Sequence, residues 1–435
     1  MLDELRQATL RQRGWRELRT IVKSCKQLLS GMGELNGLPL ARDVIERLDE
    51  LDEAALDAFF DFLAKDLSPD PADVLRLAQA YAERSDAQTL IALTQAVEPP
   101  RQELFRRLNR APGGTAALLR LRRALMQRLP QRADLQAIEH DLLHLLGSWF
   151  NPGFLQMRRV DWNAPAQLLE KIIHHEAVHA IDGWDDLRRR LQPDRRCFAF
   201  FHPQLPEEPL IFVEVALLGE MPAAIAPLID KQATPLSQER FRVAAFYSIS
   251  NCEPGLRGVS LGNFLIKSVA EQLQRELPRL RLFCTLSPIP RFAQWLLAGP
   301  VFADLPGLRK AGVVLLDKAR ARLLALCDGE LSRLQAASVH DKLGPDDAGA
   351  LQSLAAAFLV HQSTTLQSDP VARFHLDNGA RLERLNLRGN MSAAGLRQSC
   401  GLMVNYVYDL DKIEDGHARF RAGEVMHSRE VAMLL

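Results

Sequence analysis

The spacing of apolar residues changes along this chain, and the change at residues 147–153 limits the folds that the chain can adopt. Before this point, leucines recur every three or four residues, as at Leu118, Leu121, Leu125 and Leu129. That period places apolar side chains on one face of an α-helix. We therefore expect residues 1–146 to form an all-α helical bundle domain.

Proline and glycine divide this first region into helices of ordinary length, because they interrupt helical hydrogen bonding. The interruptions fall at Pro69, Pro71, Pro99, Pro100, residues 112–114 and Pro130. His140 and His144 lie one helical turn apart, but the sequence gives them no acidic or cysteine partner that would complete a ligand set. We expect the helical bundle to be a scaffold for packing or oligomerisation.

Short runs of β-branched and aromatic residues begin after residue 153 and predict strands. The runs at 197–201 and 210–217 flank a proline-containing turn and predict a hairpin, and a third strand is expected at 243–249. We expect a helix over 261–277, a strand over 280–286 and mainly helical chain over 292–367. The predicted fold class is α+β, with the helical bundle followed at 147–435 by an α/β domain with a mixed sheet.

The composition excludes several classes of function. The chain has 54 Lys and Arg against 54 Asp and Glu, so no net positive field attracts nucleic acid or an anionic membrane. No apolar run is long enough to span a bilayer, and the N-terminal sequence resembles neither a secretory signal nor a transit peptide. Six scattered cysteines without a C-x-x-C pair indicate reduced thiols. We expect a cytoplasmic protein without nucleic-acid or membrane partners.

The segment His175-Glu176-Ala177-Val178-His179 matches the H-E-x-x-H pattern of zinc hydrolases. On a helix, the pattern places two imidazoles on one face and a glutamate beside the metal-bound water. The residues that follow do not continue the longer zinc-binding patterns, so we predict no metal here. Instead, we expect a helix that buries its apolar residues and leaves the histidine and glutamate side chains at a domain surface.

A glycine loop between a strand and a helix is the stronger chemical signal. It runs through Arg257, Gly258, Val259, Ser260, Leu261, Gly262 and Asn263. Two glycines four residues apart let the backbone approach a ligand closely, and the following helix directs its N–H groups at the loop. Arg257 adds a charge for a pyrophosphate. A phosphate-binding loop and an ordinary β-to-α turn both fit this spacing.

The loop R-G-V-S-L-G resembles the pyrophosphate loop of the GNAT acetyltransferase superfamily, which binds CoA. Further segments resemble the malonyl-CoA decarboxylase family over most of the chain, most densely from 195 to 408. They are F-Y-S-I-S at 246–250, L-S-P-I-P at 286–290, F-H-L-D-N-G-A at 374–380, and S-C-G-L-M with N-Y at 399–406. The resemblance implies a GNAT-like catalytic domain after a helical domain, and a homo-oligomer, either a dimer or a tetramer.

In that family malonyl-CoA is converted to acetyl-CoA and CO2 without a metal or an organic cofactor. The resemblance implies that Ser287 and His375 are the catalytic serine and histidine and that Tyr408 is an active-site tyrosine. It also implies that residues 257–263 bind CoA, with Ser287 and His375 contacting the substrate. Ser260 departs from the pattern, because animal members have an acidic residue at this position.

These residue types suit decarboxylation of a malonyl thioester. Ser287, held before Pro288, can orient the carboxylate, and His375 can protonate the carbon because an ordinary histidine pKa of about 6.5 allows a proton near neutrality. Backbone N–H groups and Tyr408 can stabilise the enolate oxygen. The alternatives are an acyltransferase that uses acetyl-CoA and an amine, a CoA-sensing or assembly protein, and a zinc peptidase.

Overall fold

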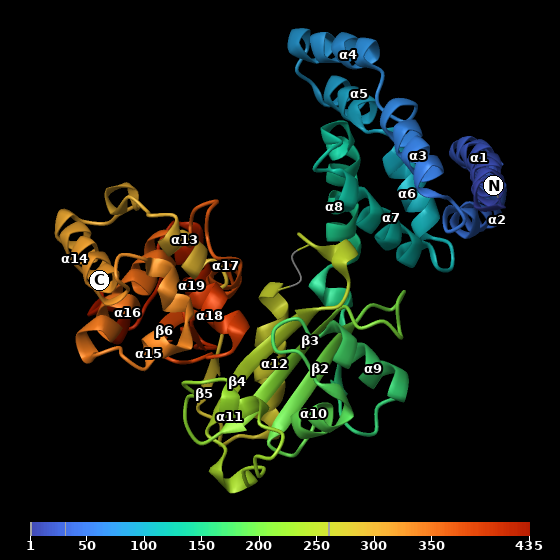
Figure 1. The fold of residues 1–435 in the computed structure, drawn as a ribbon. Helices are drawn as coiled ribbons and strands as arrows, with labels where there is room; N and C mark the ends of the chain where they lie inside the picture. The colour runs from blue at the N-terminus through green and yellow to red at the C-terminus, as the bar shows by residue number, and fades with distance from the viewer. Residues whose placement is uncertain (1, 31, 260–261) are drawn as a thin grey trace. The chain divides into compact units, whose positions relative to one another are not determined.

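The computed structural model describes residues 2–30, 32–259 and 262–435 of the chain (Figure 1). Close contacts divide the chain into two compact units. Unit 1 comprises Met1–Gln156, Phe201–Pro209 and Glu253–Ser260, and unit 2 comprises Met157–Phe200, Leu210–Cys252 and Leu261–Leu435. The turn of one hairpin and the first half of the glycine loop therefore belong with the helical part of the chain.

Unit 1 is built from helices, as the leucine spacing predicts. They are α1 (Leu2–Leu29), α2 (Met32–Leu48), α3 (Glu53–Lys65), α4 (Pro71–Glu83), α5 (Ala87–Val97), α6 (Pro100–Asn109), α7 (Gly114–Arg128) and α8 (Gln136–Trp149). The predicted interruptions are confirmed: α4 and α6 begin at prolines, and α7 ends before Pro130. Aspartates cap α3, α4 and α5 by accepting hydrogen bonds from first-turn N–H groups.

A common apolar core joins most of the helices of unit 1. Ile21, Phe59, Phe105 and Leu142, from four different helices, are fully buried in it. The hairpin of α4 and α5 differs, since neither helix has a buried side chain among the described residues. The N-terminal region is thus a set of packed helices with one helical pair outside its core.

Unit 2 contains a mixed sheet with the strand order β1-β2-β3-β4-β5-β7-β6. The strands are β1 (Gln156–Val160), β2 (Arg195–Phe201), β3 (Ile211–Leu218), β4 (Val243–Asn251), β5 (Leu282–Thr285), β6 (Arg381–Asn386) and β7 (Met403–Tyr408). β2 and β3 form the predicted antiparallel hairpin, and β4 pairs in parallel with β5. Strands β1, β6 and β7 lie outside the strand ranges predicted from the sequence.

Helices surround this sheet in unit 2. They are α9 (Ala166–His175), α10 (Gly183–Arg190), α11 (Ala226–Ile229), α12 (Gly262–Glu276), α13 (Phe292–Leu297), α14 (Lys310–Leu326), α15 (Ala337–His340), α16 (Pro345–His361), α17 (Pro370–Asp377), α18 (Ala393–Ser399), α19 (Ile413–Arg421) and α20 (Arg429–Ala432). α12 connects β4 to β5 and lies along the sheet (Figure 1), burying Leu265, Val269 and Leu273. The predicted α+β class with a helical N-terminal region and a mixed sheet is confirmed.

The H-E-x-x-H segment does not form the predicted helix. α9 ends at His175, and Glu176 and His179 are buried, whereas Ala180 is exposed. One carboxylate oxygen of Glu176 accepts hydrogen bonds from the backbone N–H groups of Val178 and His179 at 2.8 and 2.7 Å. Because a side-chain acceptor replaces the helical one, the chain turns at this point. The expectation of a surface position for Glu176 and His179 was wrong.

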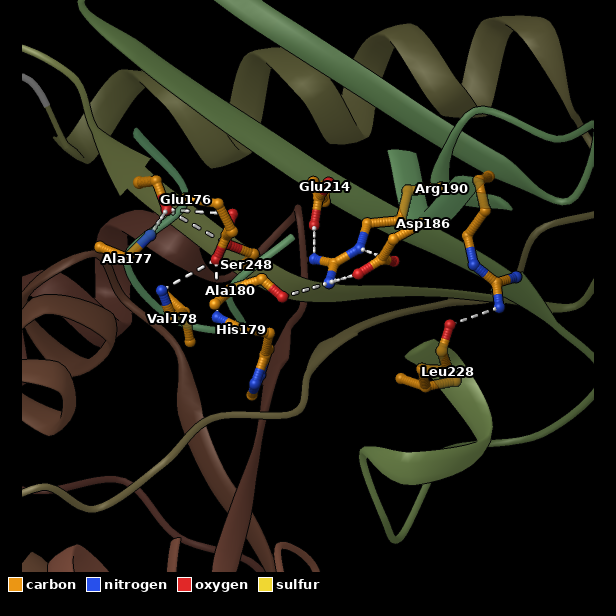
Figure 2. Close-up of polar contacts among 12 residues, drawn as sticks. Glu176, Ala177, Val178, His179, Ala180, Asp186, Arg190, Glu214, Leu228 and Ser248 are labelled. Carbon is orange, nitrogen blue, oxygen red and sulfur yellow. Dashed lines mark hydrogen bonds and ion pairs between the residues drawn. The ribbon is translucent and has the colours of Figure 1, made fainter. Parts of the chain in front are cut away.

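Buried charges connect this turn to the sheet (Figure 2). Arg190 of α10 is fully buried between Asp186 and Glu214, with N–O distances of 2.9 and 3.0 Å. Burial raises the pKa of Glu214 to about 7, against the attraction of Arg190. The pair of Arg190 with Glu214 attaches α10 to β3.

Among the described helices, each is too short or too polar to traverse a lipid bilayer.

Candidate active site

Strands β4 and β5 separate within the sheet, and the candidate site lies beside this separation. Their pairing covers Val243 to Phe246 on β4, and beyond that point β4 continues to Asn251 beside β3. The register between β3 and β4 shifts by one residue at Tyr247, which is a β-bulge. Bulges bend a strand and redirect its backbone groups. The bulge therefore lies where β4 leaves β5.

Ser287 lies just beyond β5 and is held by the neighbouring strand. Its backbone N–H donates to Val404 of β7, and its carbonyl accepts from the Val404 N–H, both at 2.9 Å. Pro288 and Pro290 follow and stop the strand. The Ser287 side chain is only 4% exposed. The backbone thus fixes the position of a buried hydroxyl where the two parallel strands separate.

His375 contacts this hydroxyl and Tyr408 contacts His375, although both residues are far from Ser287 in the sequence. Ser287 Oγ lies 3.1 Å from His375 Nε2, and His375 Nδ1 lies 2.8 Å from the Tyr408 hydroxyl. His375 comes from the last turn of α17 and Tyr408 from the end of β7, and both are nearly inaccessible to solvent. The structure therefore brings the three predicted catalytic residues together in one buried chain of hydrogen bonds.

Two residues that the sequence did not single out complete this chain. The Ser287 hydroxyl donates to Thr285 Oγ1 at 2.9 Å, and Thr285 Oγ1 also accepts from the Tyr406 backbone N–H. The Tyr406 ring stacks on the imidazole of His375, with centroids 4.8 Å apart. With Ser287 donating to Thr285, all contacts are satisfied when His375 Nε2–H donates to Ser287 and Tyr408 O–H donates to Nδ1.

A third residue, Asp369, holds the helix that carries His375. Asp369 Oδ1 caps α17 by accepting from the N–H groups of Val371 and Ala372 at 2.9 and 3.0 Å. Its second oxygen accepts from the Arg291 N–H at 2.9 Å. One carboxylate therefore ties α17 to the segment that follows Ser287. An Asp before a Pro is a recognisable helix start, so this signal was available in the sequence.

Burial determines the protonation of the group. The absence of solvent lowers the pKa of His375 to about 3 and raises the pKa of Tyr408 well above its ordinary value. At neutral pH His375 is therefore a neutral imidazole and Tyr408 keeps its proton. This corrects the expectation that an ordinary histidine pKa lets His375 carry a proton near neutrality in the free protein.

The predicted CoA-binding residues are only partly described. Arg257 is exposed and follows a short 3-10 helix (Pro254–Leu256), Gly258 has a left-handed φ of 86°, and Val259 N–H donates to the Leu256 carbonyl. Gly262 and Asn263 begin α12. Ser260 and Leu261 lie outside the described residues, so the role expected for them stays a prediction. The loop does follow a strand and open a helix, as predicted.

The H-E-x-x-H segment contacts β4 of the sheet. Figure 2 shows the Glu176 carboxylate facing Ser248, whose hydroxyl donates to both of its oxygens at 2.8 and 2.7 Å. Burial lowers the pKa of His179 to about 4, helped by the charge of Arg190. Because α9 ends at His175, the two histidines do not share a helix face, which is the arrangement that the zinc pattern requires.

Comparison with protein families decides where the chain belongs. The model of the malonyl-CoA decarboxylase C-terminal domain matches residues 153–435, and the model of the corresponding N-terminal domain matches residues 67–150. The chain belongs to the malonyl-CoA decarboxylase family. Members of this family are carboxy-lyases, so the predicted family and enzyme class are confirmed.

Relatives and solved structures agree with this assignment. The mitochondrial malonyl-CoA decarboxylase of Rattus norvegicus is 36% identical over 359 residues, covering 78% of this chain and 72% of that protein. The crystal structure of malonyl-CoA decarboxylase from Rhodopseudomonas palustris is 45% identical, covers 96% of this chain and 99% of that one, and has a TM-score of 0.84. For the Agrobacterium vitis structure the identity is 43%, the coverage 95% and 99%, and the TM-score 0.81.

Proposed function

We propose that this malonyl-CoA decarboxylase family member converts malonyl-CoA to acetyl-CoA and CO2 through Ser287, His375 and Tyr408. The observation that carries the proposal is the buried hydrogen-bond chain from Tyr408 through His375 to Ser287, with steps of 2.8 and 3.1 Å. An orienting hydroxyl beside an imidazole that can donate a proton suits a reaction that first breaks a carbon–carbon bond and then protonates carbon.

In the first step the protein orients the substrate and forms no covalent bond with it. When the substrate binds, the Ser287 hydroxyl turns its single proton from Thr285 to the substrate carboxylate and holds the breaking bond perpendicular to the thioester plane. When the bond breaks, CO2 leaves and its electron pair moves into the thioester as an enolate. Backbone N–H groups of β4 beyond Phe246, where β5 no longer pairs with it, are candidate donors to the enolate oxygen.

The second step needs a proton on the α-carbon. In the free protein His375 is neutral because burial lowers its pKa to about 3. An anionic substrate close to the imidazole favours the charged form, so we expect His375 to take up one proton when malonyl-CoA binds. The added proton goes to Nδ1, which then donates to the Tyr408 hydroxyl oxygen, so Tyr408 holds the ring in position. His375 gives its Nε2 proton to the enolate carbon, and the proton taken up balances the one that the overall reaction consumes.

The substrate would be held through its CoA part by residues 257–263. Support comes from the left-handed Gly258, the exposed guanidinium of Arg257 and the N-terminus of α12, which follows the loop. Arg257→Ala should raise KM more than it lowers kcat. Neither step calls for a metal or an organic cofactor, because the thioester itself accepts the electron pair.

One experiment tests the reaction directly. The purified chain is incubated with malonyl-CoA and EDTA, without any acyl acceptor, and both acetyl-CoA and CO2 are quantified. The proposal predicts equal amounts of the two products. A folded sample that yields neither product would contradict the proposal, and release of free CoA only after an amine is added would indicate an acyltransferase.

A homo-oligomer, a dimer or a tetramer, joined through the helical region is also proposed. The support is the α4–α5 hairpin, where Leu75, Leu90 and Ile91 are exposed and no side chain of either helix is buried among the described residues. The mass in solution, measured by light scattering, should be a multiple of the chain mass. Leu75→Asp with Ile91→Asp should reduce it, and an unchanged mass would remove this surface from the proposal.

Two further expectations stay proposals. A cytoplasmic location is supported by six cysteines that are all free and buried, as in a reducing compartment, and cell fractionation tests it. The domain bounds 1–146 and 147–435, with the first domain as a scaffold, are supported by the helical character of α1–α8. Limited proteolysis near residue 147 tests these bounds.

A further inference from the structure

A buried arginine of the helical region contacts the backbone of the glycine loop. Arg122 of α7 is 1% exposed, and its guanidinium donates from Nη1 to the Gly255 carbonyl at 2.6 Å and from Nη2 to the Arg257 carbonyl at 2.7 Å. One rigid planar group therefore fixes two carbonyls of the same short segment. Both partners belong to unit 1, together with α7.

Glu139 of α8 holds the arginine in place. Its carboxylate accepts from Arg122 Nε at 3.1 Å and from Nη2 at 2.6 Å, which is the paired geometry that sets the plane of a guanidinium. The charge of Arg122 is thus balanced inside the protein. Arg122 is suited to positioning the loop, whereas the exposed Arg257 is suited to attracting an anion.

The loop backbone is pressed against α7 at the same place. A Cβ atom on Gly255 would lie 2.7 Å from the Leu119 carbonyl oxygen, so only glycine allows this approach. Glu253 adds a second attachment, because its Oε1 accepts from the Gly255 N–H at 2.8 Å and from Arg123 Nη2 at 2.9 Å. The segment from Glu253 to Arg257 is therefore attached to α7 through several contacts.

The direction of one peptide group follows from these contacts. In a trans peptide the C=O and N–H bonds point to opposite sides, and the described chain contains no cis peptide. Since the Arg257 carbonyl points at Arg122, the N–H of Gly258 points away from α7. This N–H donates to no backbone carbonyl among the described residues, and Gly258 is exposed. Arg122 thus turns one backbone donor away from α7 at the predicted phosphate loop.

We propose that Arg122, oriented by Glu139, is a positioning residue that directs the Gly258 N–H toward the pyrophosphate of CoA. This inference rests on the proposed role of the loop in binding CoA. It gives the helical region, which carries no catalytic pattern in its sequence, a part in substrate affinity. Through the loop, Arg122 affects the recognition of a diphosphate. Substitution of Arg122 should therefore leave the binding of the pantetheine part of the substrate unchanged.

The test compares ligands with and without the diphosphate. Affinities for CoA and for pantetheine are measured by calorimetry on the full chain, with kcat and KM for malonyl-CoA. Arg122→Met should weaken CoA binding about tenfold and raise KM similarly, as expected for loss of an oriented hydrogen bond. The kcat and the pantetheine affinity should not change. Arg122→Lys should resemble Arg122→Met, because a single ammonium cannot reproduce the planar fork.

A matched control exists in the same unit. Arg101 is also buried, pairs with Asp141 at 2.6 Å and donates to the carbonyls of Leu63 and Leu67, away from the loop. Arg101→Met should cost stability and leave CoA affinity unchanged. The salt dependence of CoA affinity distinguishes Arg257 from Arg122. Added salt screens exposed charges, so it should reduce the effect of Arg257→Ala on CoA affinity but not the effect of Arg122→Lys.

If Arg122→Met does not fold, Glu139→Gln is measured in its place. We expect Glu139→Gln to bind CoA more weakly than wild type and to bind pantetheine equally well. Wild-type CoA affinity in the folded variants, or an equal loss of CoA and pantetheine, would overturn the role of Arg122 while leaving the proposed function intact. A wild-type protein that does not bind CoA at all would overturn the CoA loop and the inference together.

Discussion

The Nδ1 atom of His375 lies 2.8 Å from the hydroxyl of Tyr408, and both side chains are buried. The two residues are 33 positions apart and come from α17 and β7. This hydrogen bond leaves Nε2 of the same imidazole for Ser287 at 3.1 Å. The tyrosine therefore determines which nitrogen of His375 faces the serine, and the chemistry proposed for the site depends on that orientation.

Two neighbouring tyrosines allow a matched test of this contact. Tyr408→Phe removes the hydroxyl that holds Nδ1, so kcat should fall about tenfold while the fold persists. The Tyr406 hydroxyl is buried without a hydrogen-bond partner among the described residues, although its ring stacks on His375. Tyr406→Phe should therefore keep kcat and leave stability unchanged or higher. Equal kcat values in the two variants would contradict the role of Tyr408.

Asp369 should influence the reaction through the position of α17. Asp369→Asn replaces the oxygen that accepts from the Arg291 N–H with an NH2 group, so the link to the segment after Ser287 is lost. We expect a lower kcat and a loss of about 1 kcal/mol in the free energy of unfolding. Ser392 caps α18 in the same unit, and Ser392→Ala should cost similar stability without changing kcat. If Asp369→Asn and Ser392→Ala lower kcat to the same extent, Asp369 acts only as a structural helix cap.

Burial of His375 predicts a pH dependence of stability. Its pKa is about 3 in the folded chain against an ordinary value near 6.5, so between these values the unfolded state binds the extra proton. Stability from this residue is complete above pH 6.5 and decreases as the pH falls, by at most about 1.4 kcal/mol per pH unit. The unfolding free energy of wild type minus that of His375→Gln should therefore decrease from pH 7 to pH 4 in denaturant titrations. A constant difference would contradict the low pKa.

Much of the fold follows from local sequence signals. Prolines such as Pro71 and Pro100 mark helix starts in the structure as they do in the sequence, and the hairpin of β2 and β3 follows from its aromatic runs and proline turn. β6 was not expected because its charged residues, such as Arg381 and Arg384, hide the strand pattern; pairing with β7 stabilises it. Local patterns are informative where local interactions decide the structure.

The candidate site illustrates where local patterns fail. Family resemblance indicated Ser287, His375 and Tyr408, but Thr285 and Tyr406 join them only through contacts between β5, β7 and α17. The low pKa of His375 is likewise a result of burial that no spacing reveals. At Glu176 the local pattern predicted a helix that the structure does not form. The Glu176 carboxylate instead accepts hydrogen bonds from Ser248, 72 residues away, and from its own turn.

The central claim is that Ser287 and His375 act together on the bound malonyl group. The most direct measurement is kcat for CO2 release from saturating malonyl-CoA by Ser287→Ala and His375→Gln, with CoA affinity measured alongside. His340→Gln is the control, because His340 is equally buried but bonds the Leu334 carbonyl. We predict that kcat falls about 100-fold or more in both variants with CoA affinity retained, while the control stays near wild type. Near-wild-type kcat in either variant would contradict the account.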